Sequence, residues 1–298
     1  MGHGLLLLDK PIGLSSNVAL QKAKRALGAD KAGHTGSLDP LASGLLPLCI
    51  GEATKFSQFL LDADKTYSAR FQLGVTTASG DAEGAVLVQR PVQVGRADIE
   101  AAMAAFRGDI LQIPPIYSAI KYQGQPLYKI ARRGGSVEIQ PRAVRINRYQ
   151  LLECGDDWLD VEVACSKGTY IRSLATDLGE ALGCGAHVTA LRRLAVAGFT
   201  LEQALTLEAL DPTTPLLPTD QAMLQLPTLT VTDAHKRALL YGQTVQLADE
   251  PAAQAIRLYD AQHLFLGVGE LGMDGLLKPK RMMRIAPDAL SQTGLDLL

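Results

Sequence analysis

The sequence predicts an α+β fold with a mixed or antiparallel sheet, followed by a small β-rich C-terminal domain. Residues 66–73 alternate between apolar and polar side chains, with Tyr67 on the apolar face, which is typical of a half-buried strand. Residues 18–27 have helical spacing instead. Because strand and helix patterns mix without a regular βαβ repeat, a parallel α/β sheet is disfavoured. The length of 298 residues exceeds the usual size of one domain, so we expect two.

Local signals predict the remaining elements of the first domain. An apolar run at 5–8 predicts a buried strand, and Ser15-Ser16-Asn17 offers an N-cap for the helix at 18–27. An apolar stripe predicts a helix over 96–107, which ends before Pro114-Pro115. The other predicted elements are strands at 158–165 and 187–196 and, between them, a helix with Ile171, Leu174, Leu178 and Leu182 on one face.

A basic segment at 115–150 interrupts this pattern, with seven basic residues and a single acid. We expect residues 115–140 to form a mobile insertion with one helical turn near 126–133. The net charge of −2 argues weakly against a nucleic-acid partner, but a global balance can hide a local patch. Solvated basic faces are the alternative to phosphate contacts. The candidates for phosphate contacts are Lys121, Lys129, Arg132, Arg133 and Arg142.

A segment rich in proline and threonine at 211–227 predicts a linker. It divides the chain into domains 1–227 and 228–298. In the second domain, apolar runs at 256–259 and 264–268 flank a short turn and predict a β-hairpin. A second basic cluster lies further on, at Lys278, Lys280, Arg281 and Arg284.

The composition excludes several classes of protein. Hydrophobic residues make up 47% of the chain, far from a disordered composition. No apolar run approaches the roughly 20 residues that span a bilayer, and the run at 5–8 is too short for a signal peptide. We therefore expect a cytoplasmic protein without a membrane span. The four cysteines lack metal-ligand spacing, so we expect reduced thiols, no metal and no cofactor.

Residues 33–47 have the composition of a shaped loop that carries a single acid. Gly36 and Gly44 allow backbone angles that other residues avoid, and Pro40 excludes the helical region at Asp39. An isolated carboxylate without metal-ligand spacing suggests a nucleophile or a general base. A turn aspartate that bonds its own backbone is the alternative for Asp39.

Four more side chains are candidates for the same site. Tyr67 is either packed in the core or available as an aromatic platform for a base. Arg172 lies in the first turn of a helix, where the macrodipole favours anions; a buried ion pair would explain it, and we expect Asp39 to be the partner. Lys10 ends the first strand, where an ordinary strand-end charge is the alternative. His34 is either a polar residue satisfied within the loop or a side chain that wedges into a nucleic-acid stack.

The segment GHTGSLDPLASG at 33–44 resembles the catalytic motif of the TruB family of tRNA pseudouridine synthases. A shorter similarity at 266–270 and 277–281 resembles the PUA-like RNA-binding domain that often follows. The resemblance therefore implies a pseudouridine synthase catalytic domain with a C-terminal PUA-like domain. Further similar motifs occur in the order of that family at 6–11, 65–67, 114–121, 168–174 and 187–193.

The resemblance implies the isomerisation of one uridine to pseudouridine at position 55 in the T loop of tRNA. Asp39 is then the catalytic aspartate, Tyr67 stacks on the target base, and Arg172 pairs with Asp39. The C1′–N1 bond must break and a C1′–C5 bond must form, without a redox change. Whether the carboxylate attacks C1′ of the sugar, attacks C6 of the base or removes the 2′ proton is not decided by the sequence.

The resemblance also implies roles for the surrounding residues. Lys10 and Leu191 line the pocket, and His34 fills the space that the flipped base leaves. Extrusion of a base costs a few kcal/mol, and less in a partly unstacked T loop. The basic segment at 115–150 would then clamp the phosphates of the T arm, and we expect the protein to act as a monomer.

Two other functions remain open at this stage. An RNA-binding module or tRNA folding chaperone with a vestigial acid would also account for the basic segment and the second domain. A glycosidase is a weaker alternative, because such enzymes usually need two carboxylates and no second acid has a comparable sequence context.

Overall fold

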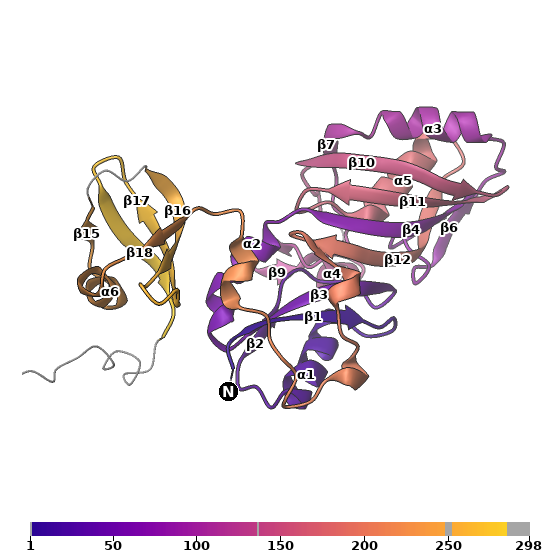
Figure 1. Cartoon of the computed structure of the whole chain (residues 1–298). Coiled ribbons are helices and arrows are strands. Elements are labelled where there is room, and N and C mark those ends of the chain that lie inside the picture. The colour runs from indigo at the N-terminus through magenta and orange to yellow at the C-terminus, as the bar shows by residue number, and fades with distance from the viewer. Residues whose placement is uncertain (1, 136, 248–251, 285–298) are drawn as a thin grey trace, which may run out of the picture.

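The computed structural model describes residues 2–135, 137–247 and 252–284, and it shows a large mixed sheet followed by a smaller one (Figure 1). The large sheet has nine strands. Seven of them follow the order β1-β3-β12-β4-β11-β10-β7, while β2 pairs with β3 and β13 with β12. Its strands are β1 (Gly4–Lys10), β2 (Ala32–His34), β3 (Ala42–Ile50), β4 (Lys65–Leu73), β7 (Gly108–Gln112), β10 (Arg142–Cys154), β11 (Trp158–Cys165), β12 (Ala186–Val196) and β13 (Phe199–Thr200).

The predicted α+β class with a mixed sheet is confirmed. Every neighbouring pair in the large sheet is antiparallel except β12 and β3, which run parallel. The helices of this domain are α1 (Ser16–Ala26), α2 (Ser57–Leu61), α3 (Arg96–Ala104), α4 (Leu127–Ala131) and α5 (Ile171–Ala181). The predicted helix over 96–107 is three residues shorter than expected, because the chain turns after Ala104 into β7.

Helices α1, α3 and α5 bury their apolar stripes against one face of the large sheet. Strand β1 is buried on both faces, which explains its continuous apolar run. Leu6 and Leu8 belong to the main core, while Leu5 and Leu7 belong to a second cluster that also contains Met223 and Val268. The N-cap predicted at 15–17 is Ser15, whose hydroxyl accepts a hydrogen bond from the backbone N–H of Val18 at 3.3 Å.

One predicted loop is shorter than the composition indicated, and the other has the predicted extent. Residues 33–34 belong to β2 and residues 42–47 to β3, so only residues 35–41 form the loop around Asp39. Of the basic segment at 115–150, only the part up to residue 141 lies outside the sheet, because Arg142 begins β10; this agrees with the extent of the insertion predicted at 115–140. The part outside the large sheet contains the pair β8 (Lys121–Tyr122) and β9 (Gln125–Pro126) and the predicted helical turn, α4.

The predicted linker at 211–227 is packed rather than extended. Leu217 exchanges backbone hydrogen bonds with Leu5 of β1, and the 3₁₀ helix η4 (Thr219–Met223) buries Ala222 and Met223 in the second cluster. The apolar side chains of this segment cover the face of β1 that carries Leu5 and Leu7. Burial of that face stabilises the packed conformation, although the composition of the segment favours turns.

The second sheet follows this segment and has five strands in the order β14-β16-β17-β18-β15. The predicted hairpin is confirmed as the antiparallel pair of β16 and β17. Phe265 places its ring 5.4 Å from that of Phe56, and Lys55 donates a 2.9 Å hydrogen bond to the carbonyl of Met282, so the second sheet contacts the first domain. Its elements are β14 (Thr228–Thr230), α6 (Asp233–Leu240), β15 (Val245–Gln246), β16 (Ala253–Tyr259), β17 (Phe265–Leu271) and β18 (Leu276–Met282).

A small two-stranded sheet, β5 (Val75–Thr77) with β6 (Val86–Gln89), lies beside β12. The turn between its strands carries Asp81 and hydrogen-bonds to β12 through the N–H of Ala82 and the carbonyl of Val188 at 2.9 Å. This contact brings a second acid to the side of the large sheet where the Asp39 loop lies.

Gly44→Ala is expected to unfold the protein at lower denaturant than the wild type. Gly44 has φ +101°, and a Cβ there would lie 2.3 Å from the backbone oxygen of Arg193, so β3 and β12 would have to separate. The left-handed backbone alone costs about 1–2 kcal/mol for an L-residue, and we expect the total loss to exceed this. Urea unfolding followed by circular dichroism measures it.

Gly108→Ala is the matched control, because Gly108 has φ +82° but open space around the added methyl group. Equal losses in the two variants would show that the close approach of β12 to Gly44 does not constrain the sheet.

Candidate active site

The carboxylate of Asp39 lies on a loop that is held from three sides. Ser16 of α1 accepts a hydrogen bond from the N–H of Leu38 at 2.7 Å and donates one to its carbonyl at 3.0 Å. The carbonyl of Pro40 accepts a 2.7 Å bond from Gly13, and that of Asp39 accepts a 3.0 Å bond from Ala42. The carboxylate therefore has a defined position between α1 and β3, although its side chain is 44% exposed.

Arg172 forms the predicted ion pair with Asp39, at 2.9 Å between Nη2 and Oδ2. Its side chain is only 6% exposed, and it also lies 3.4 Å from the carboxylate of Asp81. The same guanidinium donates hydrogen bonds to the carbonyls of Ser79 at 3.0 Å and Tyr117 at 2.9 Å. A single buried cation thus joins the Asp39 loop, the β5–β6 turn and the start of the basic segment.

The pKa of Asp39 lies above its usual value. Partial removal from water is the main cause, and the nearby charge of Asp81 adds to it, while Arg172 and Lys10 act in the opposite direction. Because the fold binds this proton more tightly than the unfolded chain does, ionisation of Asp39 removes stability as the pH rises through its native pKa. The ionised carboxylate of Asp39 therefore lowers the stability of the fold.

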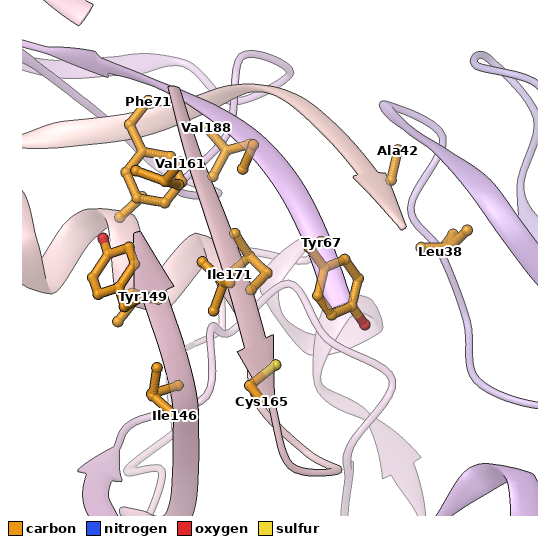
Figure 2. Close-up of a cluster of buried hydrophobic side chains, with 14 of the residues drawn as sticks. Leu38, Ala42, Tyr67, Phe71, Ile146, Tyr149, Val161, Cys165, Ile171 and Val188 are labelled. Atoms are coloured by element: carbon orange, nitrogen blue, oxygen red, sulfur yellow. The ribbon is translucent and has the colours of Figure 1, made fainter. Parts of the chain in front are cut away.

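Tyr67 lies at the edge of the main core, between Ile171 and Leu38 (Figure 2). Its ring lines a cavity of about 330 Å³ that opens beside Asp39. Tyr67 therefore belongs to the core and also lines the cavity, and its use as an aromatic platform for a base stays a prediction. Leu191 of β12 also lines this cavity, as expected.

A second cavity of about 620 Å³ adjoins the first, and His34 lines it together with Tyr128 and Arg132. The imidazole is partly buried, its Nδ1 has no hydrogen-bond partner within the described part of the chain, and burial lowers its pKa. The wall common to both cavities consists of Ser37, Leu38, Asp39, Ser118, Ala119 and Arg172. Asp39 thus lies where the two cavities meet.

Lys10 does not line either cavity, contrary to expectation. Its ammonium is fully buried and donates to the carbonyls of Leu14 at 2.6 Å and Pro11 at 2.9 Å. Burial lowers the pKa of Lys10 to about 8, and the charge of Asp39 partly opposes this shift. The charge of Lys10 therefore acts on Asp39, while its ammonium hydrogens are donated to backbone carbonyls.

The five candidate phosphate contacts fall into two groups. Lys121, Lys129, Arg132 and Arg133 are exposed on the segment outside the sheet, and none has an acidic partner within 4.0 Å among the described residues. Arg142 instead begins β10, lines the 330 Å³ cavity and places its guanidinium 4.7 Å from the centre of the Tyr170 ring.

Two other basic residues of the segment predicted at 115–150 are paired within the sheet. Arg145 lies 3.1 Å from a carboxylate oxygen of Asp109, and Arg148 pairs with Glu162. The positive surface is therefore concentrated before residue 134.

Sequence reasoning missed two charged residues of the site. Asp81 is 4% exposed beside Arg172 and accepts hydrogen bonds from Ser79 Oγ and the N–H of Glu83. Its segment, Ser79-Gly80-Asp81, has the same small and polar composition as the Asp39 loop, which is a usable signal. Arg193 is 1% exposed and lines the 330 Å³ cavity, but no sequence signal separates it from its neighbour Arg192.

This arrangement can place one carboxylate against a planar ligand held on an aromatic ring. Among the described residues, no cluster of three or more histidine, cysteine or acidic side chains is arranged to hold a metal ion. No helix in that part of the chain is long and apolar enough to cross a membrane.

Comparison with known proteins decides the family. Residues 24–171 match the model of the TruB family pseudouridylate synthase N-terminal domain, and residues 172–223 match that of the tRNA pseudouridylate synthase B C-terminal domain. Residues 227–283 match the C-terminal domain of pseudouridine synthase II TruB. The tRNA pseudouridine synthase B of Pseudomonas syringae pv. syringae (strain B728a) is 52% identical over 94% of this chain and 95% of that protein.

The chain belongs to the TruB family of tRNA pseudouridine synthases. This TruB-family chain is therefore an isomerase, and the activity of its family is the conversion of uridine to pseudouridine in tRNA. The tRNA pseudouridine synthase B of Pseudomonas aeruginosa (strain UCBPP-PA14) is 50% identical over 94% of the chain and 96% of that protein. A solved structure described as a Cbf5–Nop10–Gar1 complex matches the TruB-family chain with a TM-score of 0.70 and 27% identity, over 91% of this chain and 79% of that one.

Asp81→Asn is expected to lower the pKa of Asp39 in this TruB-family chain. The negative charge of Asp81 raises that pKa, and its removal also leaves Arg172 with one carboxylate instead of two. Titration of the Asp39 side-chain carbon by ¹³C NMR measures the shift. Asp109→Asn removes an exposed acid that pairs with Arg145, so it should leave the titration unchanged; an unchanged midpoint in Asp81→Asn would mean that the two acids are not coupled through Arg172.

Proposed function

We propose that this protein converts the uridine at position 55 in the T loop of tRNA to pseudouridine, with Asp39 as its catalytic residue. The observation that carries the proposal is the position of the Asp39 carboxylate, 2.9 Å from Arg172 at the junction of two cavities, one of which is walled by Tyr67. One cavity suits a single flipped base, and the other continues toward the exposed basic segment.

The proposed reaction requires the target base to leave its stack before the glycosidic bond is broken. Extrusion costs a few kcal/mol, and Tyr67 recovers part of this by packing against the flipped base. Leu191 lines the same cavity. His34, which lines the second cavity, is placed to fill the space vacated in the RNA.

Asp39 acts on the displaced nucleotide in its ionised form. Attack on C1′, attack on C6 and removal of the 2′ proton all start from a carboxylate, and Arg172 favours that charged state against the effect of burial. The isomerisation breaks C1′–N1 and forms C1′–C5, so the base must remain in the cavity while it rotates. Tyr67 and Leu191, which line this cavity, would contact the base during the rotation.

The exposed basic residues at 121–133 are proposed to bind the phosphates of the T arm. They lie on the segment that borders the second cavity through Tyr128 and Arg132. Charge contacts of this kind position the RNA without reading its sequence. We also propose that the protein acts as a monomer in the cytoplasm, where its four free cysteines would remain reduced.

Asp39→Asn is expected to abolish the formation of pseudouridine while the stem-loop still binds. Asparagine nearly preserves the shape of the side chain but supplies neither the negative charge nor a base or nucleophile. Wild-type and variant proteins are incubated with an unmodified T-arm stem-loop, and pseudouridine is mapped by carbodiimide labelling and mass spectrometry. Full product from the variant, or none from the wild type, would refute the proposed chemistry; retained binding with retained function in tRNA folding would favour a chaperone instead.

Arg132→Glu combined with Arg133→Glu is expected to weaken tRNA binding and to flatten its dependence on salt. Each lost phosphate contact reduces the magnitude of the slope of log K against log salt by about 0.7–0.9. Filter binding over a series of salt concentrations measures both quantities. The control is Arg96→Glu, which reverses a charge on α3 that is paired with Glu100; if both proteins behave alike, the segment does not clamp RNA.

A further inference from the structure

Two buried cations, Lys65 of β4 and Arg193 of β12, line the 330 Å³ cavity together with Asp39. The exposed fractions of these two residues are 8% and 1%. Among the described residues, no carboxylate lies within 4.0 Å of either cation, whereas Arg172 in the same cavity is paired with Asp39. Burial of an unpaired charge is costly, so the fold does not gain stability from these two charges.

The two side chains meet beside Gly36 of the Asp39 loop. Gly36 has φ +99°, and a Cβ there would lie 3.5 Å from Nη1 of Arg193 and 3.7 Å from Cε of Lys65. Apart from Gly36 and its chain neighbours, these are the only two heavy atoms of the described residues within 4 Å of that point. Because Gly36 carries no side chain and lines the cavity, a ligand atom can approach both cations there.

Arg193 keeps one end of its guanidinium free for such a ligand. Its Nε donates a 2.7 Å hydrogen bond to the carbonyl of Leu45, and its Nη2 donates a 3.1 Å bond to the carbonyl of Gly36. Nη1 makes no hydrogen bond with a residue in the described part of the chain. The two bonds that are made fix the orientation of the planar group, so Nη1 presents its hydrogens at a defined place beside Gly36.

Lys65 also has one donor more than the backbone uses. Its ammonium donates to the carbonyl of Leu61, the last residue of α2, at 3.0 Å and to that of Ala63, and an ammonium group has three hydrogens. A lysine at the end of a helix is favourable on structural grounds alone. Burial, however, lowers the pKa of Lys65 to about 8, and the charge of Arg193 is the second cause. A lysine that only capped α2 would be more stable in solvent, away from a second cation.

Negative charge develops on the base in each of the three routes that are open to Asp39. If the C1′–N1 bond breaks first, after attack on C1′ or removal of the 2′ proton, the base leaves with the electron pair of that bond and shares it with its carbonyl oxygens. If the carboxylate adds to C6, the electron pair of the C5–C6 double bond moves onto the oxygen at C4.

The later steps return this charge. An electron pair of the base forms the C1′–C5 bond, the proton on C5 is lost, and N1 gains a proton. The carboxylate of Asp39 is released from C1′ or C6, or gives the 2′ proton back, so atoms and electrons balance without an added reagent. A negative charge on a carbonyl oxygen of the base is therefore common to all three routes.

We propose that Lys65 and Arg193 are catalytic residues that stabilise this negative charge, by donating hydrogen bonds to a carbonyl oxygen of the uracil ring placed beside Gly36. The inference rests on the proposed function, because it takes the 330 Å³ cavity as the site of the flipped uridine. Donors that are already held in position stabilise a developing charge without reorganisation during the reaction. The same contacts hold the released base while it rotates.

The test crosses a protein variant with single-atom changes in the substrate. Lys65→Met removes one cation at similar side-chain length, and T-arm stem-loops carry uridine, 2-thiouridine or 4-thiouridine at the target position. Sulfur accepts hydrogen bonds more weakly than oxygen, so at least one sulfur substitution should slow the wild type about fivefold more than it slows Lys65→Met. Effects of sulfur on the base alone are common to both proteins and cancel in this ratio. Equal ratios for both sulfur positions would overturn the proposal.

The rates on unmodified uridine give a second criterion. Lys65→Met should lower the single-turnover rate about 100-fold and leave the stem-loop Kd within about threefold, because the charge appears only during the reaction. Arg193→Lys keeps a charge but removes Nη1, and it should lower the rate about tenfold or more with the same small effect on Kd. Weaker binding with an unchanged rate would mean that these cations hold the RNA rather than the charged base, and the proposal would be wrong.

Lys167→Met and Arg192→Lys are the matched controls. Lys167 pairs with Asp62 at 2.9 Å and Arg192 with Asp9 at 2.7 Å, and neither basic residue lines the cavity. The rates of both variants should stay within about twofold of the wild type. Losses as large as those expected for the two buried cations would indicate a general disturbance of the sheet, which would also overturn the proposal.

A further measurement leaves both cations in place and does not need a reacting substrate. Asp39→Asn with ¹⁵N-labelled lysine and arginine is mixed with a stem-loop that carries uridine at the target position, or with one that carries an abasic sugar there. The side-chain resonances of Lys65 and Arg193 should shift with the first stem-loop only, and identical spectra would disprove the contact with the base.

The proposed function fails by a different result, if wild-type protein forms no pseudouridine or Asp39→Asn forms it in full. Equal sulfur ratios in a protein that does depend on Asp39 would refute only the role of Lys65 and Arg193.

Discussion

The guanidinium of Arg172 is the contact on which the geometry of the site depends. Asp39, Tyr117 and the pair of Ser79 and Asp81 come from three segments of the chain, and a single side chain that is 6% exposed contacts all four residues. A planar fork with five donors can satisfy such a set in one orientation, whereas a lysine would present a single point charge. The Asp39 loop, the β5–β6 turn and the start of the basic segment therefore share one anchor.

Charges are retained in this part of the fold although they lower its stability. Lys10, Lys65 and Arg193 are buried cations whose side-chain donors bond to backbone carbonyls. Burial raises the pKa of Asp39, so its ionised form is disfavoured in the native state. A core made of apolar residues would be more stable. The retention of these charges points to a role in chemistry rather than in folding.

The two cavities on either side of Asp39 are lined by different side chains. Tyr67 and Leu191 line the smaller, and His34 and the basic segment line the larger. Under the proposed function, the carboxylate lies between a space for one base and a path toward the RNA backbone. The packed segment at 211–227 and the contact of Phe265 with Phe56 attach the second sheet to this scaffold. Under the proposed function, this attachment would let phosphate contacts of the second sheet contribute to the orientation of a nucleotide at Asp39.

The amino-acid sequence by itself determined the main elements of the fold and the shape of the Asp39 loop. Alternation predicted β4, and spacing predicted α1 and α5. The isolated Asp39 between glycines and proline left a turn aspartate and an active carboxylate open, and the resemblance to a family favoured the second. These signals are local, because they depend on the period of each element and on backbone angles that few residues adopt. The pairing of Arg172 with Asp39 was also predictable, since an arginine in the first turn of a helix lacks a local reason for its position.

Tertiary structure alone decided which residues of similar type belong to the site. Arg192 and Arg193 are adjacent in the chain, but successive side chains of a strand point to opposite faces, and only the packing of β12 between β3 and β4 buries the second of them. The same holds for Asp81, which reaches Arg172 because the β5–β6 turn bonds to β12. Lys10 shows the reverse case. Its ammonium group donates to backbone carbonyls nearby in the chain and does not line the cavity. Long-range pairing is set by the register of the whole sheet, and no local pattern encodes it.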